Sequence, residues 1–216
     1  MYLPNKQFDL ILIDPPWKYA KRSNRNTKFG LGASQQDLLT TKEMMAYPVS
    51  NIAKPECLLF MWTTMPMLED AMKIMNAWGF EYKTNAFSWV KVNKIDLKPV
   101  FGIGFYTKSN VELCLLGGRG EKAIKPRNND VSSVILHPPT EFAHKPSEVM
   151  EKIDRMYPDL QKVELFAKEK WDGPNWTQME YKNPSKEKME LNMEAEKLLA
   201  DKTTPPPPVR KSVEIK

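Results

Sequence analysis

Cysteine and histidine are the scarcest chemically reactive residues of this 216-residue chain, which has two of each. Cys57 and Cys114 lie inside apolar, strand-like runs, so we expect two small core residues and no disulfide. Without a cluster of cysteines and histidines there is no reason to expect a metal site. The chain also lacks an apolar run long enough to span a membrane and lacks a signal-peptide core, so we expect no membrane association.

Acidic residues are outnumbered, with 27 Asp and Glu against 32 Lys and Arg and a net charge of +5. This mild excess is compatible with nucleic-acid binding without requiring it. The segment from 18 to 28 holds five cations, no acid and one tyrosine: Lys18, Tyr19, Lys21, Arg22, Arg25 and Lys28. It predicts either a loop that contacts phosphates or an ordinary solvated basic loop. A second candidate basic surface runs from Arg119 to Asn129.

The rest of the chain is organised around the short apolar run Phe8 to Ile13, which Asp14-Pro15-Pro16-Trp17 follows directly. The run predicts a strand buried on both faces. The strand must stop near Asp14, because a proline pair cannot continue a hydrogen-bonded ladder. Ligands of open α/β sheets bind at the carboxyl ends of the strands. We therefore expect Asp14 and the residues after it to form the edge of a site.

An acid, a rigid backbone corner and an aromatic plane together suit a planar base that carries an exocyclic amine. Asp14 and the Pro15 carbonyl could each accept one N–H bond of that amine. Both contacts would orient the nitrogen and stabilise the positive charge that develops when a methyl group is transferred to it. Trp17 could stack on a base taken out of a helix. The alternative is an ordinary Pro-Pro turn after a buried strand, with Trp17 as core filler.

Strand-like and helix-like segments alternate along most of the remaining chain. Further strands are predicted over 57–62, 86–92, 111–116 and 162–167, and helices over 41–47, 66–78 and from about 147 to 156. This alternation predicts an α/β fold with a mainly parallel sheet. The composition changes near residue 182, after which a charged stretch precedes four consecutive prolines, 205–208. We expect a domain over 1–182 and an appendage over 183–216, a charged helix with a flexible proline-rich tail.

Asp14-Pro15-Pro16-Trp17 after a buried strand resembles the D-P-P-W motif of adenine N(6)-methyltransferases. The chain is similar to the family of the catalytic subunit of the eukaryotic messenger-RNA adenosine methyltransferase, which includes bacterial and phage DNA enzymes. Further family motifs follow in the same order: Leu59 to Thr63, Trp78-Gly79, Ser88 to Lys91, Gly102 to Tyr106, Glu112 to Leu115, His144 to Pro146 and Glu164 to Ala167. The resemblance covers roughly residues 7 to 180 and rests on this ordered set.

The resemblance implies a Rossmann-like, S-adenosylmethionine-dependent methyltransferase sheet in permuted order, with the catalytic strand first. It implies a catalytic set of Asp14, Pro15, Pro16 and Trp17. Lys145 would pair with the carboxylate of S-adenosylmethionine, and Asp14 would lie near its amino group. The further cofactor-binding residues would be Glu164, Phe166, Lys168 and Gln178. Many relatives have arginine where this chain has Lys168. A lysine keeps the positive charge but cannot form the two parallel hydrogen bonds that an arginine makes to one carboxylate.

The predicted function is methyl transfer to the exocyclic N(6) nitrogen of adenine in DNA. We favour DNA over RNA because the compact layout resembles the bacterial and phage members of the family. The open alternatives are the same chemistry on RNA adenosine, methylation of another amino base such as cytosine, and a non-catalytic nucleic-acid-binding subunit. Lys18, Tyr19, Lys21, Arg22, Arg25, Lys28 and Arg119 are the candidate nucleic-acid contacts. We expect a cytoplasmic protein of a bacterial or phage-infected cell, with a homo- or hetero-oligomer possible.

Overall fold

The fold is that of a computed structural model, which describes residues 3–19, 38–102, 104, 106–140 and 144–180. Four of the predicted nucleic-acid contacts, Lys21, Arg22, Arg25 and Lys28, lie outside these residues, as does the appendage over 183–216.

Seven strands form one sheet in the order β5-β3-β4-β2-β1-β6-β7. The strands are β1 (Phe8–Ile13), β2 (Ala53–Thr63), β3 (Glu81–Lys91), β4 (Val111–Arg119), β5 (Val134–His137), β6 (Lys162–Ala167) and β7 (Trp176–Glu180). All neighbours pair in parallel except at β4, which runs antiparallel to both β2 and β3. The first strand of the chain lies near the centre of the sheet, so the expected Rossmann-like methyltransferase fold is confirmed.

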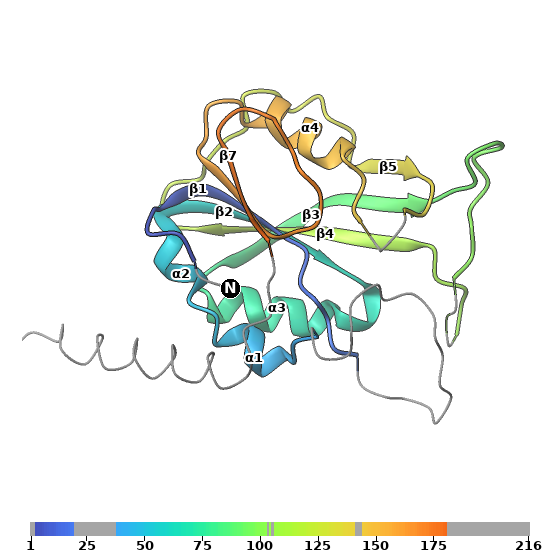
Figure 1. The fold of residues 1–216 in the computed structure, drawn as a ribbon, viewed down its shortest axis with the longest axis horizontal. Coiled ribbons are helices and arrows are strands. Elements are labelled where there is room, and N and C mark those ends of the chain that lie inside the picture. The colour runs from blue at the N-terminus through green and yellow to red at the C-terminus, as the bar shows by residue number, and fades with distance from the viewer. Residues whose placement is uncertain (1–2, 20–37, 103, 105, 141–143, 181–216) are drawn as a thin grey trace, which may run out of the picture. The chain divides into compact units, whose positions relative to one another are not determined.

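Helices cover both faces of this sheet (Figure 1). Helices α1 (Thr41–Met45), α2 (Val49–Ile52) and α3 (Leu68–Ala77) lie on one face, and α4 (Glu148–Met156) lies on the other. The predicted start of the first helix is confirmed, because the Thr40 side chain accepts from the Glu43 backbone and Glu43 bonds back to Thr40. Pro66 lies in a short 3-10 turn, η2 (Met65–Met67), that leads into α3.

The core has two layers, as a strand buried on both faces requires. On one side, Leu10 and Leu12 of β1 pack in a cluster with Trp62, Phe87 and Ile153 of α4. The alternating residues Ile11 and Ile13 are fully buried towards the other face. Cys57 and Cys114 are buried free thiols, as expected. Burial of this kind contributes about 25 cal/mol for each Å² of apolar surface removed from water.

The observed strands differ from the predicted ones mainly at β4 and at the sheet edges. The strand predicted over 111–116 is longer in the structure, because β4 continues through Gly117 and Gly118 to Arg119. A Cβ atom on Gly117 would lie 2.4 Å from the Met75 side chain, so glycine lets α3 pack close to the sheet. The short strands β5 and β7 were not predicted. Within the described part of the chain, no helix has the length and apolar character needed to cross a membrane.

Candidate active site

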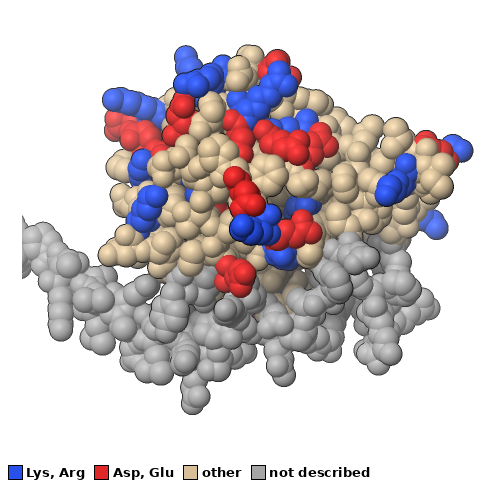
Figure 2. Space-filling model, turned by 45° about the horizontal axis from the view of Figure 1, so that its top comes forward, with Lys and Arg blue, Asp and Glu red and all other residues tan. Residues whose placement is uncertain are grey.

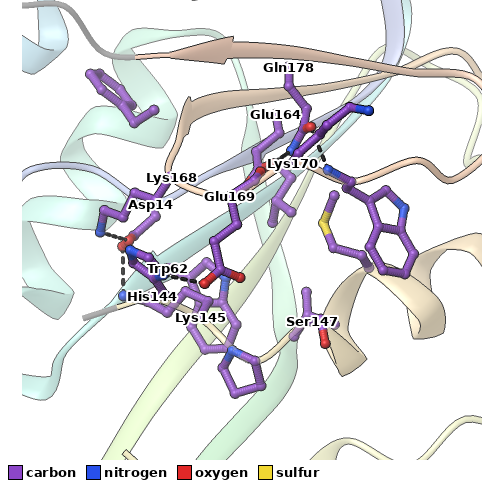
Figure 3. Close-up of a pocket in the computed structure, with 16 residues that line it drawn as sticks. Asp14, Trp62, His144, Lys145, Ser147, Glu164, Lys168, Glu169, Lys170 and Gln178 are labelled. Carbon is purple, nitrogen blue, oxygen red and sulfur yellow. Dashed lines mark hydrogen bonds and ion pairs between the residues drawn. The ribbon is translucent and has the colours of Figure 1, made fainter. Parts of the chain in front are cut away.

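Asp14 is the first residue after β1 and lies at the edge of the sheet where the parallel strands end. Its two carboxylate oxygens have different partners: Lys145 Nζ lies 2.9 Å from Oδ1, and Lys168 Nζ lies 2.5 Å from Oδ2 (Figure 3). Burial alone would raise the pKa of Asp14, but the two lysines outweigh it and hold the pKa below its usual value. Asp14 is therefore a carboxylate at neutral pH, and it acts as an acceptor.

Lys145 connects Asp14 to a second carboxylate, Glu112 at the start of β4. The Lys145 ammonium lies 3.2 Å from Glu112 Oε2 and 5.7 Å from the centre of the Trp62 ring. Lys91 lies 2.6 Å from the other Glu112 oxygen. Burial lowers the pKa of Lys145, but Asp14 and Glu112 more than offset this and raise it above the ordinary lysine value. Lys145 is therefore a fixed positive charge.

Glu164 and Gln178 form a second polar group near Asp14 and Lys145. They are register partners on β6 and β7, and Gln178 Nε2 donates to Glu164 Oε2 at 2.5 Å. Burial raises the pKa of Glu164 to about 7, although the Gln178 bond opposes the shift. Gln178 also bonds the backbone of Glu169 and Trp171, so it holds the loop after β6.

These groups line one pocket between the ends of β1 and β6 and the start of α4. All six predicted cofactor-binding residues contribute to its lining: Asp14, Lys145, Glu164, Phe166, Lys168 and Gln178. Its apolar walls include Leu12, Val149 and Met150. Figure 3 shows the lysine-bound carboxylate and the Glu164–Gln178 pair at two ends of this lining. The pocket thus offers a cation, carboxylates and apolar surface to one ligand.

Phe166 holds an unusual backbone conformation beside the pocket. Its φ is +62°, in the left-handed region that bulky residues rarely adopt, at a point where the β6–β7 register shifts. Such a residue stores on the order of 1–3 kcal/mol of strain. Its ring is buried and lies 6.0 Å from the Tyr47 ring, a packing contact that helps to offset the strain. The bulge turns the chain after β6 towards the pocket, where Lys168 reaches Asp14.

The Asp14-Pro15-Pro16-Trp17 corner is braced by the backbone and by Trp17. The Pro15 carbonyl accepts from the Trp17 backbone N–H at 2.9 Å, and the Pro16 carbonyl accepts from Leu39. The Trp17 side chain is 6% exposed, and its indole N–H donates to the Trp62 carbonyl at 3.3 Å. Most of the Trp17 ring therefore packs in the core, as the alternative interpretation of this residue expects. Stacking of Trp17 on a base stays a prediction, and only the small exposed part of the ring could make that contact.

The predicted nucleic-acid contacts do not all lie at this edge. Lys18 and Tyr19 follow the corner, and the Tyr19 hydroxyl bonds Thr64 at 3.0 Å. Arg119 lies at the opposite end of the sheet, where it pairs with Cys57 in the first half of β2, and it donates to the Ser50 carbonyl at 2.9 Å. Arg119 therefore lies on a surface separate from that of Asp14, because β4 runs antiparallel and ends at the other edge of the sheet, and its contact with nucleic acid stays a prediction.

Sequence reasoning gave no role to Trp62 and Trp171, which line the pocket, or to Glu112, which pairs with the pocket residue Lys145. Glu112 lies in an otherwise apolar strand segment, and a lone acid in such a segment is the signal that could have identified it. Trp171 lines the pocket, and its indole N–H donates to Asp154 of α4 at 3.2 Å. His144 and Glu169 both line the pocket and bond to each other through the His144 Nδ1 atom.

Comparison with known proteins gives consistent matches. The MT-A70 family model matches residues 8–181. The type II methyltransferase M.MunI of a Mycoplasma species is 32% identical over 189 residues, which cover 81% of this chain and 78% of that protein. The catalytic subunit METTL3 of the human N(6)-adenosine-methyltransferase is 28% identical over 171 residues, 79% of this chain but 27% of that protein. The human N(6)-adenine-specific methyltransferase METTL4 is 31% identical over 190 residues, 80% of this chain and 36% of that protein.

Proposed function

Because the chain belongs to the MT-A70 family, whose members are adenine N(6)-methyltransferases, we propose that it transfers a methyl group from S-adenosylmethionine to N(6) of adenine in DNA. The observation that carries the proposal is the Asp14 carboxylate, held by Lys145 and Lys168 at the rim of a pocket directly before the Pro15-Pro16 corner. A scaffold protein would not need a desolvated, charged site of this kind.

The pocket fits S-adenosylmethionine by the chemistry of its lining. The fixed charge of Lys145 suits a carboxylate, and the Asp14 and Glu112 carboxylates nearby suit an ammonium group. Glu164 and Gln178 can bond hydroxyl groups, and Leu12, Val149 and Met150 offer apolar surface to a purine. When bound, S-adenosylmethionine supplies a methyl group activated by its sulfonium charge.

The residues of this chain then orient the acceptor. An ionised carboxylate has about four lone-pair positions, so Asp14 keeps acceptor capacity beyond its two lysine contacts. One N–H of the amine can bond Asp14, and the other can bond the Pro15 carbonyl, whose direction is fixed by the corner. Asp14 does not act as a strong base, because its pKa is held low. Methylation makes the amine acidic, so the proton can leave to water afterwards. Positioning and charge placement supply most of the rate enhancement.

We test the cofactor assignment with Lys145→Ala. The variant should bind S-adenosylmethionine at least about tenfold more weakly by calorimetry, because it removes a buried cation that would pair with the donor carboxylate. Lys91→Ala is the matched control, since Lys91 pairs with Glu112 but does not line the pocket. Equal donor affinity of wild type and Lys145→Ala would show that the pocket is oriented differently.

DNA is preferred over RNA because the type II methyltransferase is 32% identical to this chain, whereas the adenosine methyltransferase subunit is 28% identical. The test compares DNA and RNA oligonucleotides of the same sequence, by methyl incorporation from labelled S-adenosylmethionine. We expect incorporation into DNA, with mismatched or single-stranded adenine reacting at least as well as paired adenine, because the base must leave the stack. A strong preference for RNA would overturn the substrate and leave the chemistry standing.

A further inference from the structure

The segment between β3 and β4, residues 92–110, projects from the sheet as an arm at the right of Figure 1. We call it the β3–β4 arm, and its described residues are 92–102, 104 and 106–110. It contains two tight turns one after the other. Val92 pairs with Pro99 across the first turn, and Gly102 pairs with Ser109 across the second. The arm is therefore a built feature of the fold.

Backbone bonds hold the first turn firmly. The Asn93 N–H donates to the Lys98 carbonyl at 2.7 Å, the Leu97 N–H donates to the Asn93 carbonyl at 3.0 Å, and the Asn93 side chain caps the Ile95 N–H at 2.8 Å. Leu97 has a φ of +54°, which a leucine adopts only at a cost. In the second turn, a Cβ on Gly104 would lie 1.6 Å from the Thr107 carbonyl oxygen, so glycine permits the close approach.

These turns present large apolar and aromatic side chains to solvent. Ile95 and Tyr106 are each 93% exposed, and Leu97 and Phe101 are more than half exposed. Single exposed hydrophobic residues are ordinary, but four within twelve residues on two hydrogen-bonded turns are not explained by the core. They indicate a surface that another molecule covers.

The positive charge of the arm indicates which kind of partner it binds. Exposed lysines occupy 94, 98 and 108, and the one acid on the described part of the arm, Asp96, pairs with Lys98 at 3.2 Å. Figure 2 shows lysine or arginine side chains in excess over acidic ones on the projecting part at the right. Lysines interleaved with aromatic side chains are typical of surfaces that bind nucleic acid.

The arm also lies beside the site. It follows the carboxyl end of β3, which runs parallel to β1, so it leaves the sheet at the same edge as Asp14. Lys91 and Glu112, at its two ends, connect to Asp14 through Lys145. Lys94 and Leu97 line a hollow together with His144 and Glu169, which also line the donor pocket.

We propose that the β3–β4 arm binds the DNA that flanks the target adenine. Lys94, Lys98 and Lys108 contact phosphates, and Phe101 and Tyr106 contact sugars and bases. This inference rests on the proposed function, because it takes the nucleic acid to be the substrate of the neighbouring site. A second copy of the chain is disfavoured as the partner, because it would bring the same excess of positive charge against the arm.

The test uses the full chain and a dye-labelled DNA duplex, with binding followed by anisotropy over a range of salt concentrations. The arm variant combines Lys94→Gln, Lys98→Gln and Lys108→Gln. The control variant combines Lys6→Gln, Lys54→Gln and Lys83→Gln, which removes the same charge at the opposite end of the sheet. We expect the arm variant to bind DNA at least about tenfold more weakly than wild type. The slope of log binding constant against log salt concentration should become shallower by about 0.9 for each phosphate that no longer has a lysine partner. The control variant should stay within about twofold of wild type.

A second pair of variants tests the aromatic contacts. Tyr106→Ser should weaken binding about fivefold with little change in salt dependence, and the control Tyr82→Ser, at the opposite end of β3, should not. Methyl transfer by the wild type to the same duplex reports on the proposed function separately. A selective loss of binding in the arm variants supports the arm even if no methyladenine forms.

Three results would overturn the proposal. One is equal binding by the arm and control variants. Another is a wild type that does not bind the duplex at all. The third is a changed oligomeric state of the arm variants with unchanged DNA binding, which would assign the arm to contacts between copies of the chain.

Discussion

Asp14 combines two properties that rarely occur together, because it is largely buried and yet fully ionised. Lys145 and Lys168 make this possible, and Glu112 keeps Lys145 in place. A carboxylate that is desolvated and held ionised is a strong and directional acceptor. The proposed chemistry needs such an acceptor for an amine that is a poor nucleophile in its planar form.

Asp14→Asn should reduce methyl transfer at least about a hundredfold, because it removes a preorganised negative charge next to the reacting nitrogen. The variant should fold, since Lys145 keeps Glu112 as a partner and Lys168 is partly exposed. Asp9→Asn is the matched control: Asp9 also lies on β1 and pairs with Lys54, but it does not line the pocket. Transfer at a near-normal rate by folded Asp14→Asn would remove Asp14 from the reaction.

Glu164 should make the stability of the protein depend on pH. Its pKa is raised to about 7 in the folded chain, so the native state binds a proton more tightly than the unfolded state does. The free energy of unfolding should therefore fall as pH rises from about 4.5 to about 7. Glu164→Gln should remove this pH-dependent loss of stability. Above pH 7 its free energy of unfolding should exceed that of wild type by at most about 3 kcal/mol. Urea unfolding at several pH values measures the difference, and parallel curves for the two proteins would contradict it.

At the level of single residues, the sequence predicted which side chains lie together mainly where a residue belongs to a recognisable motif. Four of the six proposed cofactor residues lie in the ordered motifs, Lys168 and Gln178 come after them, and the structure brings all six to one pocket, while their roles stay predictions. The ion pair between Lys168 and Asp14 could not be predicted, because it depends on the turn after Phe166. The position of Arg119 relative to Asp14 could not be predicted, since charge alone does not tell at which end of a strand a residue lies.

At the scale of elements, one largely buried carboxylate joins α4, β6 and β7. Asp154 of α4 accepts from the indole N–H groups of Trp171 and Trp176 and pairs with Lys162 at 3.1 Å. The Lys162 side chain is fully buried at the start of β6 and also donates to the Tyr157 carbonyl. This cluster fixes the pocket-lining Trp171 relative to the helix that follows Lys145.

Asp154→Ala should destabilise the protein by about 3–5 kcal/mol, because it leaves the buried Lys162 cation without its carboxylate. Asp159→Ala removes an exposed partner of Arg127 and should cost less than about 1 kcal/mol. Denaturant unfolding of both variants gives the comparison. Similar small losses for the two would show that Lys162 finds another partner.

The predicted elements were confirmed where apolar runs are long, as in β1 and β6. The edge strands were missed because their sequences lack that signal: β5 has four residues, and most of β7 is only half-buried. The direction of β4 could not be predicted either, because period-two burial is the same for parallel and antiparallel strands.

At the scale of the whole molecule, the sheet concentrates its chemistry at one edge. The donor pocket, the corner after β1 and the base of the β3–β4 arm share that edge, whereas Arg119 lies at the other. The DNA proposed as substrate would therefore meet the pocket and the arm at the same edge of the sheet.

A chain that ends at Lys182 should fold and bind S-adenosylmethionine with unchanged affinity, because all seven strands and the pocket lining lie before residue 181. Thermal unfolding followed by circular dichroism and donor calorimetry would check this. Insolubility or weaker donor binding would show that residues 183–216 contribute to the domain.

The central claim is tested most directly by identifying the product. The full chain is incubated with S-adenosylmethionine carrying a deuterated methyl group and with DNA, and the DNA is then digested to nucleosides for mass spectrometry. We predict deuteromethyl label in N(6)-methyldeoxyadenosine, formed by wild type and absent with Asp14→Asn. Label found only in methylcytosine, or no label at all from a wild type that binds donor and DNA, would contradict the account.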